Sequence, residues 1–143
     1  MKIVISADSL LGIASELPGW VRSHGHDVVL WGALRPGADN EWAPCSASAA
    51  EEVAAGRADQ AIVCCTTGTG ASIAANKVRG VRAALCGDAA TAAGARRYND
   101  ANVLCISLRL TSGPVMQAWF DAEIDPAQAA NIAHVKRLDQ PAN

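Results

Sequence analysis

The chain has 143 residues, of which 50% are hydrophobic and 18% are charged. That length and composition predict one ordered domain over residues 1–143 and exclude an intrinsically disordered chain. The formal net charge of -2, without any block of like charges, excludes the basic footprint expected of proteins that bind nucleic acids or anionic membranes.

The N-terminal run of apolar residues meets Asp8 before it could serve as the core of a signal peptide. No apolar stretch approaches the roughly 20 residues that cross a bilayer. The five cysteines form no Cys-x-x-Cys pair, and their odd number is typical of free thiols in a reducing compartment. A cytoplasmic protein without a metal site is therefore expected.

Five short apolar runs, partly β-branched, are predicted to be strands buried on both faces of a parallel sheet. In chain order they cover residues 3–5, 28–31, 61–64, 83–86 and 103–106. Segments with helix signals separate these runs. The order predicts an α/β fold, namely a Rossmann-like, doubly wound, five-stranded parallel sheet with helices on both faces and an extra C-terminal helix.

Two helices are predicted before the third strand. Apolar residues at helical spacing indicate a helix that begins near Ser15 and ends at Gly25. The capping-box pattern Ser48–Glu51 indicates the start of a second helix, which Gly56 ends. The segment 35–44, which contains Trp42, is then the one long loop.

The second half of the chain carries further helix starts. The glycine-rich turn 65–72 leads into a helix, and Asp88 is suited to cap an alanine-rich helix that runs to about Tyr98. Ser112 with the following proline opens another helix. A last helix is predicted over residues 125–138, with no strand after it.

Doubly wound sheets bind ligands beyond the carboxyl ends of their strands, so a site is expected in the loops that follow the strands. The turn 65–72 follows the third strand and carries two glycines. Glycines let several N–H groups point to one spot, and a helix N-terminus adds positive character, so the turn is suited to a phosphate or a developing oxyanion. A tight turn without a ligand is the alternative.

Nucleotide binding is a weaker alternative for the same turn. The turn lacks the glycine spacing and the Gly-Lys-Ser/Thr ending of a P-loop. A dinucleotide fingerprint needs glycine or alanine where Ile73 stands, although Asp88 lies at a suitable distance for a ribose contact.

Cys65 is the candidate base or nucleophile, because a thiol at a helix N-terminus can be activated near neutral pH. The other cysteines have a simpler interpretation. Cys64, Cys86 and Cys105 lie within predicted strands, where most cysteines are small buried hydrophobes. Cys45 falls in the predicted long loop, and its role stays open.

The sequence from Cys65 to Arg109 resembles the ribose-5-phosphate isomerase B family, which also includes the galactose-6-phosphate isomerase subunits. The resemblance extends more weakly over nearly the whole chain. The residues that carry it are Cys65-x-Thr67-Gly68-x-Gly70-x-Ser72-Ile73-Ala74-Ala75-Asn76-Lys77, Arg82-Ala83-Ala84-Leu85-Cys86, Asn99-Asp100-Ala101-Asn102-Val103, Asp8 and Arg109.

This resemblance implies an aldose–ketose isomerase that acts through an enediolate, with Cys65 as the base and Thr67 assisting ring opening. It implies no metal or organic cofactor, and a homodimer or tetramer with active sites at the subunit interface. The partner molecule is then a small sugar or sugar phosphate. The implied substrate-binding positions are Asp8, Ser9, Gly68, Gly70, Ser72, Tyr98, Asn99 and Arg109.

The chain departs from the family pattern at four positions. Ser9 and Tyr98 stand where the family usually has histidines, and Gln128 and Ile132 stand where its last helix usually has phosphate-binding arginines. The first two replacements do not titrate near neutrality, so acid–base assistance to ring opening is put in doubt.

Three explanations of the missing phosphate clamp stay open. Cations later in the last helix, at residues 134–137, could replace the arginines. Arg109 or Arg35 could hold a phosphate that is placed differently. Otherwise the substrate is less charged and Tyr98 and Trp42 line its pocket.

The sequence thus predicts an isomerase of a sugar phosphate or related polyhydroxy carbonyl compound. The alternative is a non-catalytic sugar-phosphate-binding subunit that pairs with a catalytic homologue.

Overall fold

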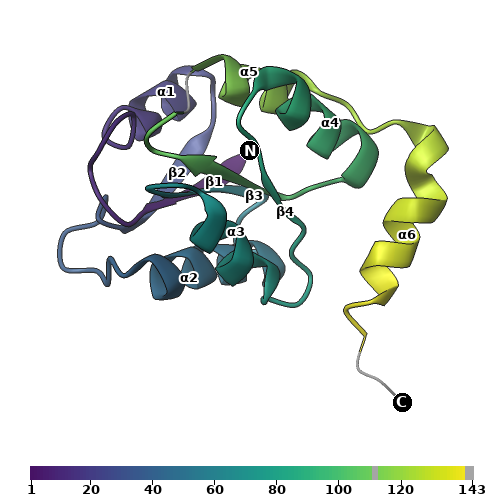
Figure 1. The fold of residues 1–143 in the computed structure, drawn as a ribbon, viewed down its shortest axis with the longest axis horizontal. Coiled ribbons are helices and arrows are strands. Elements are labelled where there is room, and N and C mark those ends of the chain that lie inside the picture. Colours follow the sequence, from purple (N-terminus) through teal and green to yellow (C-terminus); the bar gives the residue numbers. More distant parts are fainter. Residues whose placement is uncertain (111–112, 141–143) are drawn as a thin grey trace.

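The computed structural model describes residues 1–110 and 113–140. Five parallel strands form one sheet in the order β2-β1-β3-β5-β4, which confirms the predicted fold class (Figure 1). The strands are β1 (Lys2–Ala7), β2 (Asp27–Gly32), β3 (Gln60–Cys65), β4 (Ala83–Leu85) and β5 (Val103–Ser107). The three central strands are almost entirely buried, whereas β2 and β4 are partly exposed because each lies at an edge of the sheet. The prediction that all five strands are buried on both faces is therefore wrong for β2 and β4.

Helices cover both faces of the sheet (Figure 1). Each face has its own apolar core. One core joins the sheet to α1 (Leu17–Ser23), α4 (Ala89–Asn99) and α5 (Gly113–Asp121). The other core joins it to α2 (Trp42–Ala54) and α3 (Thr69–Asn76). A short 3-10 helix, η1 (Pro126–Gln128), leads into α6 (Ala129–Arg137). None of the helices among the described residues is long and apolar enough to span a membrane.

Helix α2 begins at Trp42, six residues before the predicted capping box, so the prediction of a loop over 35–44 is wrong at its end. Pro44 lies in the first turn of α2, where backbone N–H groups have no helical partner and a proline is tolerated. Cys45 is buried in that turn, and the Ser6 hydroxyl donates to its carbonyl oxygen over 3.0 Å. Tertiary burial therefore starts the helix earlier than the local signal indicated.

Other predicted helix boundaries are confirmed. The Asp88 carboxylate caps α4 by accepting from the Thr91 N–H over 2.7 Å. Gly25 and Gly56, which follow α1 and α2, have φ values of +88° and +76°. The predicted helix start at Ser112 lies outside the described residues.

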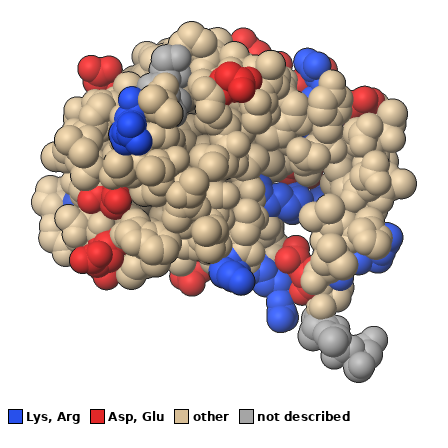
Figure 2. All heavy atoms as spheres, in the orientation of Figure 1, with Lys and Arg blue, Asp and Glu red and all other residues tan. Residues whose placement is uncertain are grey.

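Helix α6 lies apart from the sheet and contacts α4 (Figure 1). It is tied to the body through Asp100, which follows α4 with a φ of +48°. The Asp100 carboxylate forms ion pairs with Arg82 at 3.3 Å, Arg96 at 3.1 Å and Lys136 at 3.1 Å. Figure 2 shows Lys and Arg atoms in the hollow between α6 and the body. Asp100 is therefore the electrostatic anchor of this helix.

Asp100→Asn is expected to lower the free energy of unfolding at neutral pH by about 1–3 kcal/mol, because three cations lose their partner. Asparagine tolerates the left-handed backbone, so the substitution removes mainly the charge. The three cations outweigh burial and hold the pKa of Asp100 below its usual value. A carboxyl with a depressed folded pKa stabilises above its unfolded pKa, and this contribution is lost as pH falls through the folded value. Urea unfolding at pH 7 and pH 3 measures both effects.

The matched control is Asp121→Asn, because Asp121 accepts hydrogen bonds only from the Gln117 amide among the described residues. The free energy of unfolding of that variant is expected to lie within about 0.5 kcal/mol of the value for the unmodified chain. An Asp100→Asn variant as stable as this control at pH 7 would contradict the anchoring role.

Candidate active site

A cavity of about 290 Å³ opens at the carboxyl ends of β1 and β3. These strands are neighbours at the point where the chain reverses its direction across the sheet, which is where doubly wound folds place ligands. The Asp8 N–H donates to the Cys64 carbonyl over 3.2 Å and so holds the two strand ends together. The cavity is lined by Asp8, Trp42, Cys65, Thr66, Thr67, Thr69 and Gly70.

The glycine turn gives the cavity its shape. Gly68 has a φ of +78°, and a Cβ there would lie 2.9 Å from the Ile106 carbonyl carbon, so only glycine fits this position without strain. Helix α3 begins directly afterwards. The first backbone hydrogen bond of this helix runs from the Ser72 N–H to the Gly68 oxygen over 3.1 Å. The N–H groups of the preceding residues in this first turn have no partner within the helix. They are the donors that an anion at this turn would meet.

Cys65 ends β3 and lies at the wall of this cavity. Its side chain is 5% exposed, and its sulfur accepts a hydrogen bond from the Gly68 N–H over 3.1 Å. The neighbouring hydroxyls of Thr67 and Thr69 are 2.7 Å apart. The structure thus places a thiol, two hydroxyls and a helix N-terminus around one small space.

Asp8 follows β1 and brings a carboxylate to the same cavity. Its Oδ1 is buried and has no hydrogen-bond partner within residues 1–110 and 113–140. Burial raises the pKa of Asp8, its backbone hydrogen bond opposes this, and the negative charge of Glu41 adds to the increase. An unpaired buried acceptor lowers the stability of the fold.

The remaining cysteines do not line this cavity. Cys64, Cys86 and Cys105 are fully buried, as predicted for inert thiols, and burial raises the pKa of Cys86 to about 11. At the predicted position Ser72, the backbone N–H donates to the Gly68 oxygen over 3.1 Å, and Ser72 is not among the residues that line the cavity.

Two other predicted residues lie away from the cavity. Arg109 is exposed, and its backbone N–H donates to the Ser107 hydroxyl over 3.1 Å. The Ser9 hydroxyl accepts from the Leu11 N–H over 3.4 Å within the loop after β1. Neither side chain is among those that line the cavity.

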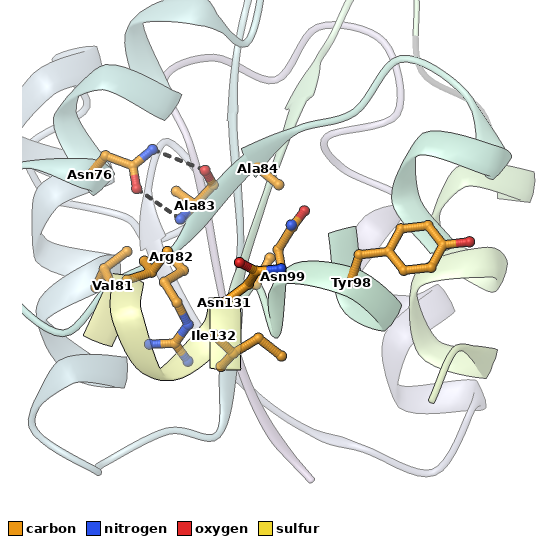
Figure 3. A pocket seen from close by; sticks show the side chains of 11 residues that line it. Asn76, Val81, Arg82, Ala83, Ala84, Tyr98, Asn99, Asn131 and Ile132 are labelled. Carbon is orange, nitrogen blue, oxygen red and sulfur yellow. Dashed lines mark hydrogen bonds between the residues drawn. The ribbon is translucent and has the colours of Figure 1, made fainter. Parts of the chain in front are cut away.

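Tyr98 and Asn99 line a different cavity, of about 310 Å³, between α4, β4 and α6 (Figure 3). Asn76 pairs with the outer edge of β4 there, because its amide donates to the Ala83 oxygen and accepts from the Ala83 N–H, both over 2.9 Å. The predicted site residues therefore fall into two groups within one chain. Cys65 and its neighbours form one group, and Tyr98 with Asn99 forms the other.

Within residues 1–110 and 113–140, none of the side chains that line the Cys65 cavity is a cation. Ile132, at one of the positions where the family resemblance implies an arginine, is the buried residue of α6 and is only 8% exposed. Lys136 is engaged with Asp100, and Arg35 lies over the Trp31 ring at 4.6 Å from its centroid. Arg137 contacts the ring of His134 over 3.4 Å.

Trp42 lines the Cys65 cavity, as one of the alternatives drawn from the sequence expected, although it was not among the predicted site residues. The sequence placed it in a loop, whereas it is the first residue of α2 and lies against the glycine turn. Its aromatic character in a segment near the site was the only local signal. The proposed ribose contact of Asp88 has a simpler explanation, since that carboxylate caps α4.

Comparisons with known proteins agree with this architecture. The family model described as "Ribose/Galactose Isomerase" matches residues 3–140. Galactose-6-phosphate isomerase subunit LacB of Clostridium acetobutylicum is 32% identical over 98% of this chain and 83% of that protein. D-erythrulose-4-phosphate isomerase 2 of Mycolicibacterium smegmatis is 40% identical over 64% of this chain and 62% of that protein.

A solved structure has the same fold. Ribose-5-phosphate isomerase B of Clostridium thermocellum superposes with a TM-score of 0.84 at 31% identity, and the match covers 97% of each chain. The family model, the relatives and the fold thus agree over nearly the full length of the sequence. The chain belongs to the ribose/galactose isomerase family, and its relatives mark it as an aldose–ketose isomerase.

Proposed function

We propose that this chain interconverts an aldose and a ketose through an enediolate, with Cys65 as the base and a sugar phosphate or related polyhydroxy carbonyl compound as substrate. The observation that carries the proposal is the cavity that Cys65, Asp8 and the first residues of α3 line together. An enediolate needs a base beside the reacting carbon and N–H donors beside the oxygen that becomes negative.

The proton transfers balance as follows. The Cys65 thiolate takes the proton of the carbon next to the carbonyl, and the C–H electron pair forms the C=C bond while the carbonyl π pair moves to oxygen. First-turn N–H groups of α3 stabilise that oxygen. The thiol then returns the proton to the neighbouring carbon, and a hydroxyl proton moves from one sugar oxygen to the other. Asp8 accepts a hydrogen bond from a sugar hydroxyl, and Thr67 assists ring opening.

A second copy of the chain completes the site in this proposal. Tyr98 and Asn99 line a cavity other than that of Cys65, so a dimer or tetramer is the arrangement in which both groups contact one substrate. Four large apolar side chains are exposed on α3, on β4, on α6 and directly after α6, and a partner would cover them: Ile73, Leu85, Val135 and Leu138. The phosphate then meets cations outside the Cys65 cavity, with Arg109 as the candidate that also fits the family pattern.

The alternative function is a non-catalytic subunit that binds a sugar phosphate and pairs with a catalytic homologue. The buried Ile132 and the lack of any cation lining the Cys65 cavity favour it. Ser9 and Tyr98, which replace histidines of the family, also fit this alternative.

One experiment on the purified chain separates the two functions. The chain is incubated in heavy water with ribose 5-phosphate, D-erythrulose 4-phosphate or galactose 6-phosphate, and NMR follows deuterium at the carbon next to the carbonyl. The isomerase should incorporate deuterium into at least one of them, and light scattering should give a mass at least twice that of one chain. Ligand binding without deuterium incorporation would support the non-catalytic alternative instead.

A further inference from the structure

The indole of Trp42 lies on the backbone of the glycine turn. A Cβ built at Gly70 would come within 2.8, 3.0 and 3.2 Å of three ring carbons of Trp42, and these are the nearest heavy atoms around that position. Gly70 does not have a positive φ, so the backbone conformation does not require glycine there. The lack of room for a side chain beside the Trp42 ring is what favours glycine. Trp42 is nevertheless 45% exposed, because much of the ring surface is left open.

The position of Trp42 gives the cavity one large apolar wall. The other lining groups are a thiol, a carboxylate, the threonine side chains and glycine backbone, without a cation. Sugar carbons carry C–H bonds as well as hydroxyls, and aromatic rings give contact area to such C–H groups at little conformational cost. A volume of about 290 Å³ lies just below the range of roughly 300–1,000 Å³ that is typical of small-molecule sites. The cavity therefore suits a short, uncharged carbon chain.

We propose that Trp42 is a specificity-determining residue, whose indole packs against the sugar carbons beyond the reacting pair and favours substrates of four or five carbons over six. This inference rests on the proposed isomerase function. The indole lies against Gly70, and no hydrogen bond joins it to Cys65 or Asp8, so it selects and positions the substrate without taking part in proton transfer. The anionic end of the substrate lies outside this cavity.

Trp42→Ala is the first test, measured on the four-, five- and six-carbon sugar phosphates named above. For D-erythrulose 4-phosphate, KM is expected to rise about tenfold while kcat changes little. The ratio of kcat/KM for galactose 6-phosphate to that for D-erythrulose 4-phosphate should rise about tenfold, because the vacated space admits a longer chain. Trp42→Phe should return KM and the chain-length preference most of the way to the values of the unmodified chain. Trp20→Phe is the matched control, because that ring stacks on His24 and not on the cavity.

Gly70→Ala is the second test and keeps the tryptophan. The new methyl group should displace the indole and reproduce the rise in KM. In the double variant Trp42→Ala/Gly70→Ala the methyl group meets no ring, so the second substitution should add little to the first. Gly87→Ala is the control, because a Cβ there meets nothing within 4 Å.

The possible outcomes separate this inference from the proposed function. In one outcome the unmodified chain turns over a sugar, and neither Trp42→Ala nor Gly70→Ala changes KM or the preference for chain length. That outcome would overturn the role of Trp42 and leave the isomerase function standing. An equal loss of kcat/KM on all three sugars, with no restoration by Trp42→Phe, would reduce Trp42 to a structural residue. An unmodified chain that turns over none of the sugars would overturn the isomerase function and this inference with it. If Trp42→Ala fails to fold, Gly70→Ala decides.

Discussion

Cys65→Ala is expected to abolish the exchange of solvent deuterium into the carbon next to the substrate carbonyl, with a loss of at least about 10³-fold in kcat. The reason is that Cys65, the last residue of β3, is the one thiol among the described residues that line the cavity. The Asp8 carboxylate also lies there, but it follows a different strand and is assigned to the sugar hydroxyls. Cys65→Ser should be similarly inactive, because a hydroxyl at this position is a far weaker base than a thiolate.

Cys86→Ala is the matched control for this experiment. Cys86 is fully buried, its thiol donates to the Ala84 oxygen over 3.6 Å, and it does not line the cavity. This variant is expected to keep its exchange activity, with a modest decrease in Tm from the small void. Thermal unfolding of all variants confirms that they are folded. Undiminished deuterium exchange by a folded Cys65→Ala variant would remove Cys65 from the role of base.

The sheet and the glycine turn could be predicted from the sequence because both depend on local patterns. β1, β3 and β5 are continuous apolar runs, and burial on both faces requires that composition. Gly68 and Gly70 were recognisable because the turn between a strand and a helix needs a tight backbone. The crevice beside Asp8 and Cys65 then follows from the parallel order of the strands.

The start of α2 and the packing of Trp42 on Gly70 could not be predicted, because contacts between residues distant in the sequence decide them. The local capping pattern at residues 48–51 was a valid signal, but burial of Cys45 against β1 extends the helix past it. Trp42 reaches Gly70, which is 28 residues later in the sequence. No local periodicity encodes such a contact.

The arrangement of Tyr98 and Asn99 has a different physical reason. The family resemblance predicted them as substrate-binding residues alongside Cys65, and in one chain they line another cavity. A single sequence specifies its own fold, whereas a site shared between chains depends on the assembly. The deuterium experiment, which tests turnover, and the light-scattering experiment, which tests the mass of the assembly, must therefore be done together to test the proposed dimer.

Gly68→Ala is expected to reduce kcat by at least about 100-fold and to lower the free energy of unfolding by about 1–3 kcal/mol. The φ of +78° strains any residue with a Cβ. The added methyl group would lie 2.9 Å from the Ile106 carbonyl carbon and 3.0 Å from the Ser107 nitrogen, which are backbone atoms of β5 that cannot move aside cheaply. The turn must then shift, and the Gly68 N–H leaves its position 3.1 Å from the Cys65 sulfur.

Gly19→Ala is the control for this prediction, because Gly19 lies inside α1 with nothing within 4 Å of a new Cβ. Alanine favours the helix there, so that variant should be as stable as the unmodified chain or up to about 1 kcal/mol more stable, with unchanged turnover. Urea unfolding and steady-state kinetics on the same preparations measure both quantities. A Gly68→Ala variant with full kcat would mean that catalysis does not need the observed geometry of the turn, and the role of its N–H groups in holding the enediolate would have to be abandoned.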